Sequence, residues 1–155
     1  MQFRKILVSS LSSFFYIGYL PFIPGTFGSL AGLVLFFAAR NNPSACIILA
    51  LVMTLLGFLV SGSAERIAGR KDPSHIVIDE VSGMLLSLLF LPYDIKLLLL
   101  GFLLFRILDT LKPFPAGALQ DLPGSLGVMG DDIIAAVYTN AILQFVFRTA
   151  SFKIW

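Results

Sequence analysis

The acidic residues of this chain lie at the ends of apolar segments, and this arrangement restricts its fold more than any other feature. The carboxylates that adjoin apolar segments are Asp79, Glu80, Asp109, Asp131 and Asp132. A charged group held against hydrocarbon is costly and usually marks a functional position. The sequence therefore predicts apolar helices whose ends carry the chemistry.

Composition indicates that these helices lie in a membrane. Hydrophobic residues make up 57% of the 155 residues and charged residues 13%, whereas soluble globular proteins have about 45–50% and about 25%. A chain of this length favours a single domain over residues 1–155. Cys46 is the only cysteine, which excludes an intrachain disulfide and a cysteine-rich metal site. The absence of a basic stripe or an aromatic-basic module argues against nucleic-acid binding.

An N-terminal stretch, residues 1–20, precedes five apolar segments. Serines interrupt it and no small-residue cleavage site precedes Pro21, so we expect an interfacial helix rather than a signal peptide. The apolar segments cover residues 27–39, 45–60, 81–91, 97–108 and 133–147. Each is shorter than the roughly 20 residues of a simple span, so the segments are either buried helices of a soluble bundle or helices that continue into their polar flanks. The composition favours the second interpretation, an all-α integral membrane protein with about five short transmembrane or membrane-embedded helices.

Counting these segments along the chain places nearly all acidic residues on one side of the membrane. That side holds the N-terminal stretch and residues 62–80 and 109–132, and only Asp94 lies opposite. Seven of the eleven Lys and Arg residues share the acidic side, and an excess of basic residues marks the cytoplasmic face. We therefore expect a polar site at the cytoplasmic helix ends, with Lys153 and Trp155 as anchors at the opposite interface.

The clustered carboxylates on this side are typical of a site for a hard cation. Oxygen ligands with few histidines suit Mg²⁺, which usually takes one or two carboxylates together with substrate phosphate. The expected metal ligands are Asp79, Glu80, Asp109, Asp131 and Asp132. Capping of a helix N-terminus explains Asp131 equally well, but it does not explain acidic groups that come from three different segments.

Two basic residues adjoin the carboxylates. Arg106, Asp109 and Lys112 follow one another at intervals of three, so they share roughly one face while the helix lasts. Pro113 disfavours helical geometry at the residue before it, so we expect the helix to end near Lys112. The arrangement could join a metal site to a phosphate site. The structural alternative is a snorkelling Arg and Lys with a neutralising Asp.

A turn with two glycines, residues 21–29, leads into the first apolar segment. Glycines allow close approach of the backbone, and the N–H groups of a new helix suit phosphate. Thr26 or Ser29 either caps this helix or donates a hydrogen bond to a phosphate oxygen.

Four sequence blocks stand in order along residues 18–138. They are residues 24–30 (PGTFGSL), Asp72-Pro73 with residues 76–83 (IVIDEVSG), residues 105–115 (FRILDTLKPFP) and residues 127–132 (GVMGDD). Together they resemble the phosphatidylglycerophosphatase A family of bacterial membrane enzymes. The resemblance implies Mg²⁺-dependent removal of the terminal phosphate from phosphatidylglycerophosphate to give phosphatidylglycerol, at the cytoplasmic leaflet of the bacterial inner membrane.

The resemblance also assigns roles to residues of this chain. The positions that it implies are functional are Asp79, Glu80, Asp109, Lys112, Asp131 and Asp132. With Lys112, the residues expected to bind the lipid phosphate are Thr26, Ser29 and Arg106. Alternatives to this reading are a phosphatase for another membrane lipid phosphate, a CDP-alcohol phosphotransferase and a small transporter. The short segments are also compatible with a homo-oligomer.

Overall fold

The computed structural model describes residues 2–149, which form only helices, turns and loops. The helices are α1 (Gln2–Ser12), the short 3-10 helix η1 (Ile17–Tyr19), α2 (Pro24–Ala39), α3 (Pro43–Ala68), α4 (Ile78–Ser87), α5 (Ile95–Leu111), α6 (Ala116–Gln120) and α7 (Ser125–Thr149). The all-α prediction is confirmed. Lys153 and Trp155, the expected anchors, lie outside the described residues.

Two of the described helices, α3 and α7, are long and apolar enough to cross a membrane by length and composition. They have 26 and 25 residues, whereas α2, α4 and α5 have 16, 10 and 17. The outward face of α3 is an apolar stripe of residues that are 60–66% exposed, namely Ile48, Leu51, Leu55 and Leu59. Such a continuous exposed apolar surface is typical of a face that contacts lipid or a partner.

The first helix is shorter than the expected one. α1 ends at Ser12, and the three residues that follow Ser13 have left-handed backbone angles, with φ of 45° at Phe14, 54° at Phe15 and 68° at Tyr16. Left-handed residues interrupt a right-handed helix. The expected stretch 1–20 is therefore a helix, a left-handed turn and η1 within the described residues.

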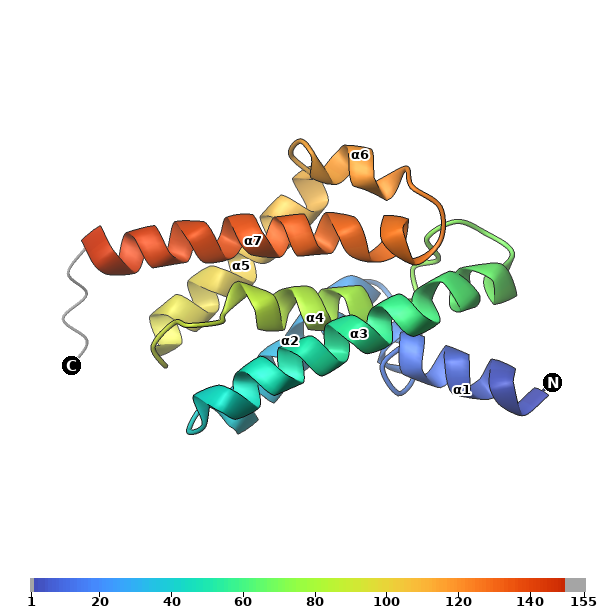
Figure 1. Ribbon diagram of the computed structural model, residues 1–155, viewed down its shortest axis with the longest axis horizontal. Coiled ribbons are helices and arrows are strands. Elements are labelled where there is room, and N and C mark those ends of the chain that lie inside the picture. The colour runs from blue at the N-terminus through green and yellow to red at the C-terminus, as the bar shows by residue number, and fades with distance from the viewer. Residues whose placement is uncertain (1, 150–155) are drawn as a thin grey trace.

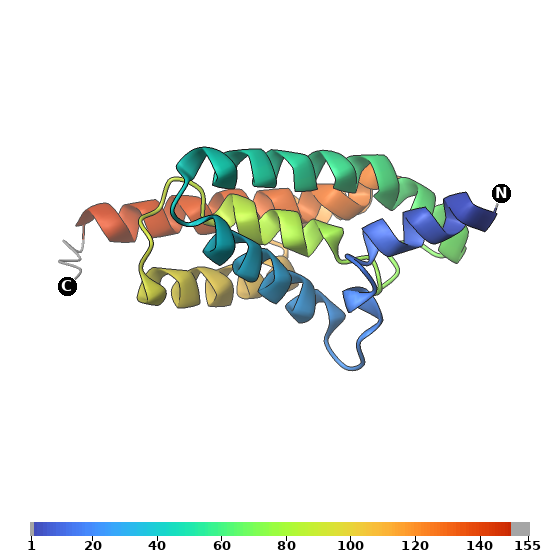
Figure 2. The ribbon, with the colours of Figure 1, turned by 90° about the horizontal axis from the view of Figure 1, so that it is seen from below.

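α4 lies at the centre of the bundle, between α2, α3 and α7 (Figures 1 and 2). Its side chains Val81, Met84 and Leu85 are fully buried there. Glycines bring α2 against it: a Cβ added at Gly32 would lie 2.6 Å from the Val81 carbonyl oxygen. Small residues allow this close backbone approach. The contact holds the third turn of α2 against the first turn of α4.

α4 ends at Ser87, although the apolar segment that predicted it runs on to residue 91. α7 supplies the hydrogen bonds that this early end requires. Asn140 Nδ2 donates to the carbonyl oxygens of Ser87 and Leu89 at 3.0 and 2.8 Å, and Gln144 Nε2 donates to that of Phe90 at 3.2 Å. The last carbonyls of a helix have no partner within the helix. These side-chain donors therefore let α4 stop inside the bundle.

Candidate active site

The carboxylates that the sequence analysis singles out meet in one pocket, formed by the first turn of α4, the last turn of α5 and the second turn of α7. The pocket has a volume of about 440 Å³. All six residues that the sequence places in catalysis line it, namely Asp79, Glu80, Asp109, Lys112, Asp131 and Asp132. The expected substrate contacts Thr26 and Arg106 line it as well, whereas Ser29 does not.

The carboxylates form two groups that share Asp132. One group is Asp79, Glu80 and Asp132, and the other is Asp109, Asp131 and Asp132. Within each group, one oxygen from every residue lies within 4.8 Å of the others. Both groups have the size and the ligand type of a cation site. Asp132 belongs to both because α7 carries it into the middle of the pocket.

Three carboxylate oxygens in these groups are buried without a hydrogen-bond partner among the described residues. They are Glu80 Oε2, Asp131 Oδ1 and Asp132 Oδ2. Buried polar atoms are normally paired, and an exception calls for an explanation such as an ion. An all-oxygen donor set is the one that Mg²⁺ prefers. The residues of this pocket therefore fit the Mg²⁺ ion expected from the sequence.

The first turn of α4 precedes the apolar part of that helix and holds two strongly perturbed acids. Burial raises the pKa of Asp79 well above its usual range, and the charges of Glu80 and Asp132 raise it further. Burial also raises the pKa of Glu80, to about 7. Both shifts disfavour the charged forms. A bound cation would restore the charged forms, because it stabilises carboxylates.

Each basic residue of the pocket pairs with a carboxylate. Arg106 Nη1 lies 2.8 Å from Asp109 Oδ2, and Lys112 Nζ forms an ion pair with Asp131. Burial alone would lower the pKa of Lys112, but the hydrogen bond and charge of Asp131 raise it above its usual value. Lys112 is therefore a cation. The Arg106–Asp109 pair is the one that the alternative of a neutralising Asp also expects, whereas Lys112 pairs with a carboxylate of another helix.

The end of α5 explains how Lys112 reaches α7. The helix ends at Leu111, as the proline after Lys112 predicts, and Lys112 has a left-handed backbone with φ of 46°. Left-handed geometry is unfavourable for residues other than glycine. This turn directs the Lys112 side chain across the pocket instead of along the face that Arg106 and Asp109 share.

Two capping interpretations are wrong. α7 begins at Ser125, so Asp131 and Asp132 lie inside the helix and not at its start. α2 begins after Ile23 and has no side-chain cap, so neither Thr26 nor Ser29 caps it. The N–H groups of Thr26 and Phe27 donate to the Ile23 carbonyl oxygen at 3.1 and 3.3 Å, so among the described residues Gly25 has the free N–H group of this first turn, at the pocket wall that it forms with Thr26.

Ser29 lies behind Arg106 and is fully buried. Its hydroxyl donates to the Gly25 carbonyl at 3.0 Å and accepts a hydrogen bond from Arg106 Nη1 at 3.4 Å. Gly25 is equally tight, since a Cβ there would lie 2.2 Å from Glu80 Oε1. The first two turns of α2 therefore hold the Arg106 and Glu80 side chains in place.

Sequence reasoning missed Asp72, an exposed residue that also lines the pocket. Its backbone is left-handed, with φ of 41°, and its N–H donates to Glu65 Oε1 at 3.1 Å. A non-glycine residue in this conformation is uncommon. Its position in the second sequence block, directly before Pro73, could have marked Asp72 as a residue of the site. Ser74 and Thr110 complete the polar lining.

Comparison with known proteins identifies one family whose model matches most of the chain. The family model for phosphatidylglycerophosphatase A matches residues 10–147. Phosphatidylglycerophosphatase A of Escherichia coli is 34% identical over 132 residues, which is 83% of this chain and 77% of the relative. The protein of the same description from Haemophilus influenzae is 34% identical over 124 residues, 77% of this chain and 76% of the relative.

A third relative carries a different description. A protein of Bacteroides thetaiotaomicron, provisionally described as a phosphatidylinositol-3-phosphatase, is 32% identical over 137 residues, 81% of this chain and 84% of the relative. No solved structure matches the chain significantly.

Proposed function

The chain belongs to the phosphatidylglycerophosphatase A family, and we propose that it hydrolyses phosphatidylglycerophosphate to phosphatidylglycerol and inorganic phosphate with the help of Mg²⁺. Membership makes the protein a lipid phosphatase of phosphatidylglycerol biosynthesis. The observation that carries the proposal is the meeting of six carboxylates and two cations in one pocket.

Mg²⁺ would be held by Asp79, Glu80, Asp109, Asp131 and Asp132. The unpaired buried oxygens of Glu80, Asp131 and Asp132 support this assignment. When bound, Mg²⁺ neutralises phosphate charge, polarises the phosphoryl group and can lower the pKa of a bound water. Without a bound cation, the negative carboxylates would repel one another and the substrate phosphate, so the pocket would need the cation to bind its substrate.

Lys112 and Arg106 bind the non-bridging oxygens of the phosphate in this proposal. The side chains of Arg106 and Lys112 are only 23% and 25% exposed, and a donor aimed at developing charge is worth more where it is partly withdrawn from water. The Thr26 hydroxyl and the free N–H group of Gly25 at the start of α2 complete the phosphate contacts. Ser29 is a positioning residue, because it touches Arg106 and not the pocket.

The reaction breaks the bond between phosphorus and the glycerol oxygen, and a proton goes to that leaving oxygen. The oxygen that forms the new bond to phosphorus comes from a water molecule or from one aspartate, which would form an aspartyl-phosphate that water then hydrolyses. Acid quenching during turnover with ³²P-labelled substrate separates the two routes, since only the second leaves label on the protein.

We also propose that the pocket faces the cytoplasm and that α2, α4 and α5 are embedded in the inner membrane beside α3 and α7. The larger share of basic residues on the pocket side supports this orientation. The glycerol phosphate head group then reaches the helix ends while the acyl chains remain in the bilayer.

A second substrate is favoured by one relative. The Bacteroides thetaiotaomicron protein, whose description names a lipid with a phosphate on an inositol ring, has an identity close to that of the other two relatives. The phosphate contacts proposed above suit any lipid phosphomonoester, so the head group has to be tested directly.

Phosphate release from phosphatidylglycerophosphate in detergent micelles tests the proposal, with Mg²⁺ or with EDTA and with phosphatidylinositol 3-phosphate as a parallel substrate. We expect release only with Mg²⁺, and loss of release in a folded Asp131→Asn variant. Asp121→Asn is the matched control, because Asp121 is exposed and forms an ion pair with Lys71 outside the pocket. Phosphate release that persists in EDTA would contradict the metal site. Faster release from phosphatidylinositol 3-phosphate would show that this lipid, and not phosphatidylglycerophosphate, is the preferred substrate.

A further inference from the structure

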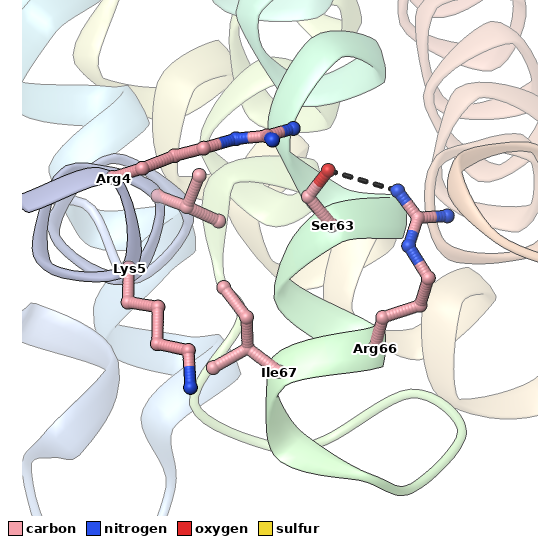
Figure 3. A pocket seen from close by; sticks show the side chains of 6 residues that line it. Arg4, Lys5, Ser63, Arg66 and Ile67 are labelled. Atoms are coloured by element: carbon pink, nitrogen blue, oxygen red, sulfur yellow. Dashed lines mark hydrogen bonds between the residues drawn. The ribbon is translucent and has the colours of Figure 1, made fainter. Parts of the chain in front are cut away.

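A second pocket, of about 300 Å³, lies between α1 and α3 (Figure 3). Arg4, Lys5 and Val8 of α1 line one side of it, and Ser63, Arg66 and Ile67 of α3 line the other. None of these six residues lines the acidic pocket. Figure 3 shows the Arg4 side chain extending from α1 toward Ser63, and the Lys5 side chain passing beside Ile67.

The lining contains three cations and no carboxylate. Among residues 2–149, the ion pairs are Lys71 with Asp121, Arg106 with Asp109 and Lys112 with Asp131, so none involves this pocket. Arg66 Nη2 donates to Ser63 Oγ at 3.0 Å, which leaves its other N–H groups available. Glu65, the acid next to Arg66 in the chain, accepts the Asp72 N–H instead.

Unpaired cations from two helices are typical of a site for an anion. Arg side chains present several N–H donors in a plane and bind phosphate oxygens in pairs. Arg4 and Arg66 approach from opposite walls, so one phosphate between them would contact both α1 and α3.

The side of α1 that is turned away from this pocket is apolar and exposed. On α1, Phe3, Ile6 and Leu7 are 78%, 53% and 48% exposed, whereas Val8 is buried. An amphipathic helix with a basic side and exposed apolar residues is typical of the membrane interface. Ile67 in the opposite wall is also exposed. With the apolar side of α1 at the membrane, the basic pocket lies at the level of the lipid head groups, so an anionic lipid matches it better than a free anion does.

We propose that this pocket binds the phosphodiester head group of an anionic phospholipid, which ties α1 to α3 at the membrane surface. Arg4 and Arg66 donate to the non-bridging oxygens and Lys5 adds a positive charge. The site is separate from the acidic pocket, and its ligand is not hydrolysed there. The proposal does not depend on the identity of the substrate.

The test is calorimetric titration of the purified protein in a non-ionic detergent with dioctanoyl phosphatidylserine, whose phosphate is a diester. Dioctanoyl phosphatidylcholine and inorganic phosphate serve as the zwitterionic lipid and the free anion. We expect Arg4→Gln and Arg66→Gln each to weaken binding of the anionic lipid about fivefold, the usual contribution of one cation at a membrane surface. Lys71→Gln removes the same charge outside this pocket and should change binding less than twofold. Lys112→Gln, in the acidic pocket, should also leave the affinity for phosphatidylserine unchanged.

Several results would overturn the proposal. Unchanged affinity in both arginine variants, or an equal loss in Lys71→Gln, would assign the binding to general surface charge. Equal affinity for phosphatidylcholine and phosphatidylserine would show that the cations do not select the anionic lipid. Inorganic phosphate that binds as tightly as phosphatidylserine would show that the pocket is a site for free anions. Arg4 and Arg66 are exposed, and unchanged thermal unfolding of each variant shows that folding is intact. Phosphate release is not measured, so this proposal and the proposed function fail independently.

Discussion

Lys112, the residue that follows α5, forms an ion pair with Asp131 of α7. The pair crosses the acidic pocket, and Asp131 Oδ1 remains buried without a partner beside it. The same carboxylate can therefore face a lysine on one oxygen and a cation on the other. In this way the pair links the proposed phosphate contacts to the proposed metal ligands.

Lys112→Gln should lower kcat/KM for phosphate release by about 10²–10³, the usual loss when a donor to developing charge is removed. The substitution removes the charge and keeps a side chain of similar length. Phosphate release at several lipid concentrations measures the change. Lys71→Gln, on the exposed pair with Asp121, is the control. A loss below threefold in Lys112→Gln would contradict the role of Lys112 in the phosphate site.

Asp132→Asn should be more damaging than Asp79→Asn, because Asp132 belongs to both carboxylate groups and Asp79 to one. We expect a rise in the Mg²⁺ concentration needed for half-maximal activity in both variants and the larger rise in Asp132→Asn. Titration of activity with Mg²⁺ measures it. Equal Mg²⁺ dependence in wild type and Asp132→Asn would show that the shared carboxylate is not a ligand.

Mg²⁺ should also stabilise the folded protein without any substrate. An ion that binds only the folded state raises the free energy of unfolding with its concentration. We therefore expect the thermal midpoint of wild type in detergent to rise with added Mg²⁺ and to fall with EDTA, whereas Asp132→Asn should respond weakly. The same shift in both proteins would place the stabilising ion elsewhere.

The sequence predicts the helical class and the meeting of the carboxylates, because each acid adjoins an apolar segment and alternate segment ends share one side. It does not predict where α4 stops. The apolar run continues to residue 91, and the end at Ser87 depends on donors from Asn140 and Gln144, far away in the chain. Such tertiary contacts leave no local pattern.

The start of α7 was missed for a related reason. Residues 124–130 contain three glycines, which reads as a loop, yet the helix begins at Ser125. A Cβ at Gly127 would lie 2.1 Å from the Leu122 carbonyl oxygen, so this glycine is required by close packing and not by a turn. Asp72 was missed because its place in the pocket depends on the path of a loop.

Ser29 and Arg106 should act as one unit. Ser29→Ala removes the hydroxyl that accepts from Arg106 Nη1, so we expect a loss of about three- to tenfold in kcat/KM from an imperfectly held guanidinium. In an Arg106→Ala background the same substitution should have little further effect, since contacting residues are not additive. Thr26→Ala removes a hydroxyl that lines the pocket, and its loss in kcat/KM should be additive with that of Arg106→Ala. Full additivity of Ser29→Ala with Arg106→Ala would show that Ser29 acts by another route.

Gly25→Ala should impair activity more than stability. The added Cβ would lie 2.2 Å from Glu80 Oε1 and 3.1 Å from Arg106 Nη2, so the methyl group displaces one expected metal ligand and one expected phosphate contact. Both are side-chain ends that can move, and alanine favours a helix more than glycine does. We therefore expect a loss of activity of at least tenfold with a thermal midpoint close to that of wild type, because a displaced donor loses about that much or more. Gly130→Ala is the matched control, since its Cβ would meet the Leu119 Cβ at 3.3 Å and no atom of the pocket. Wild-type activity in Gly25→Ala would show that Glu80 and Arg106 do not need their present positions.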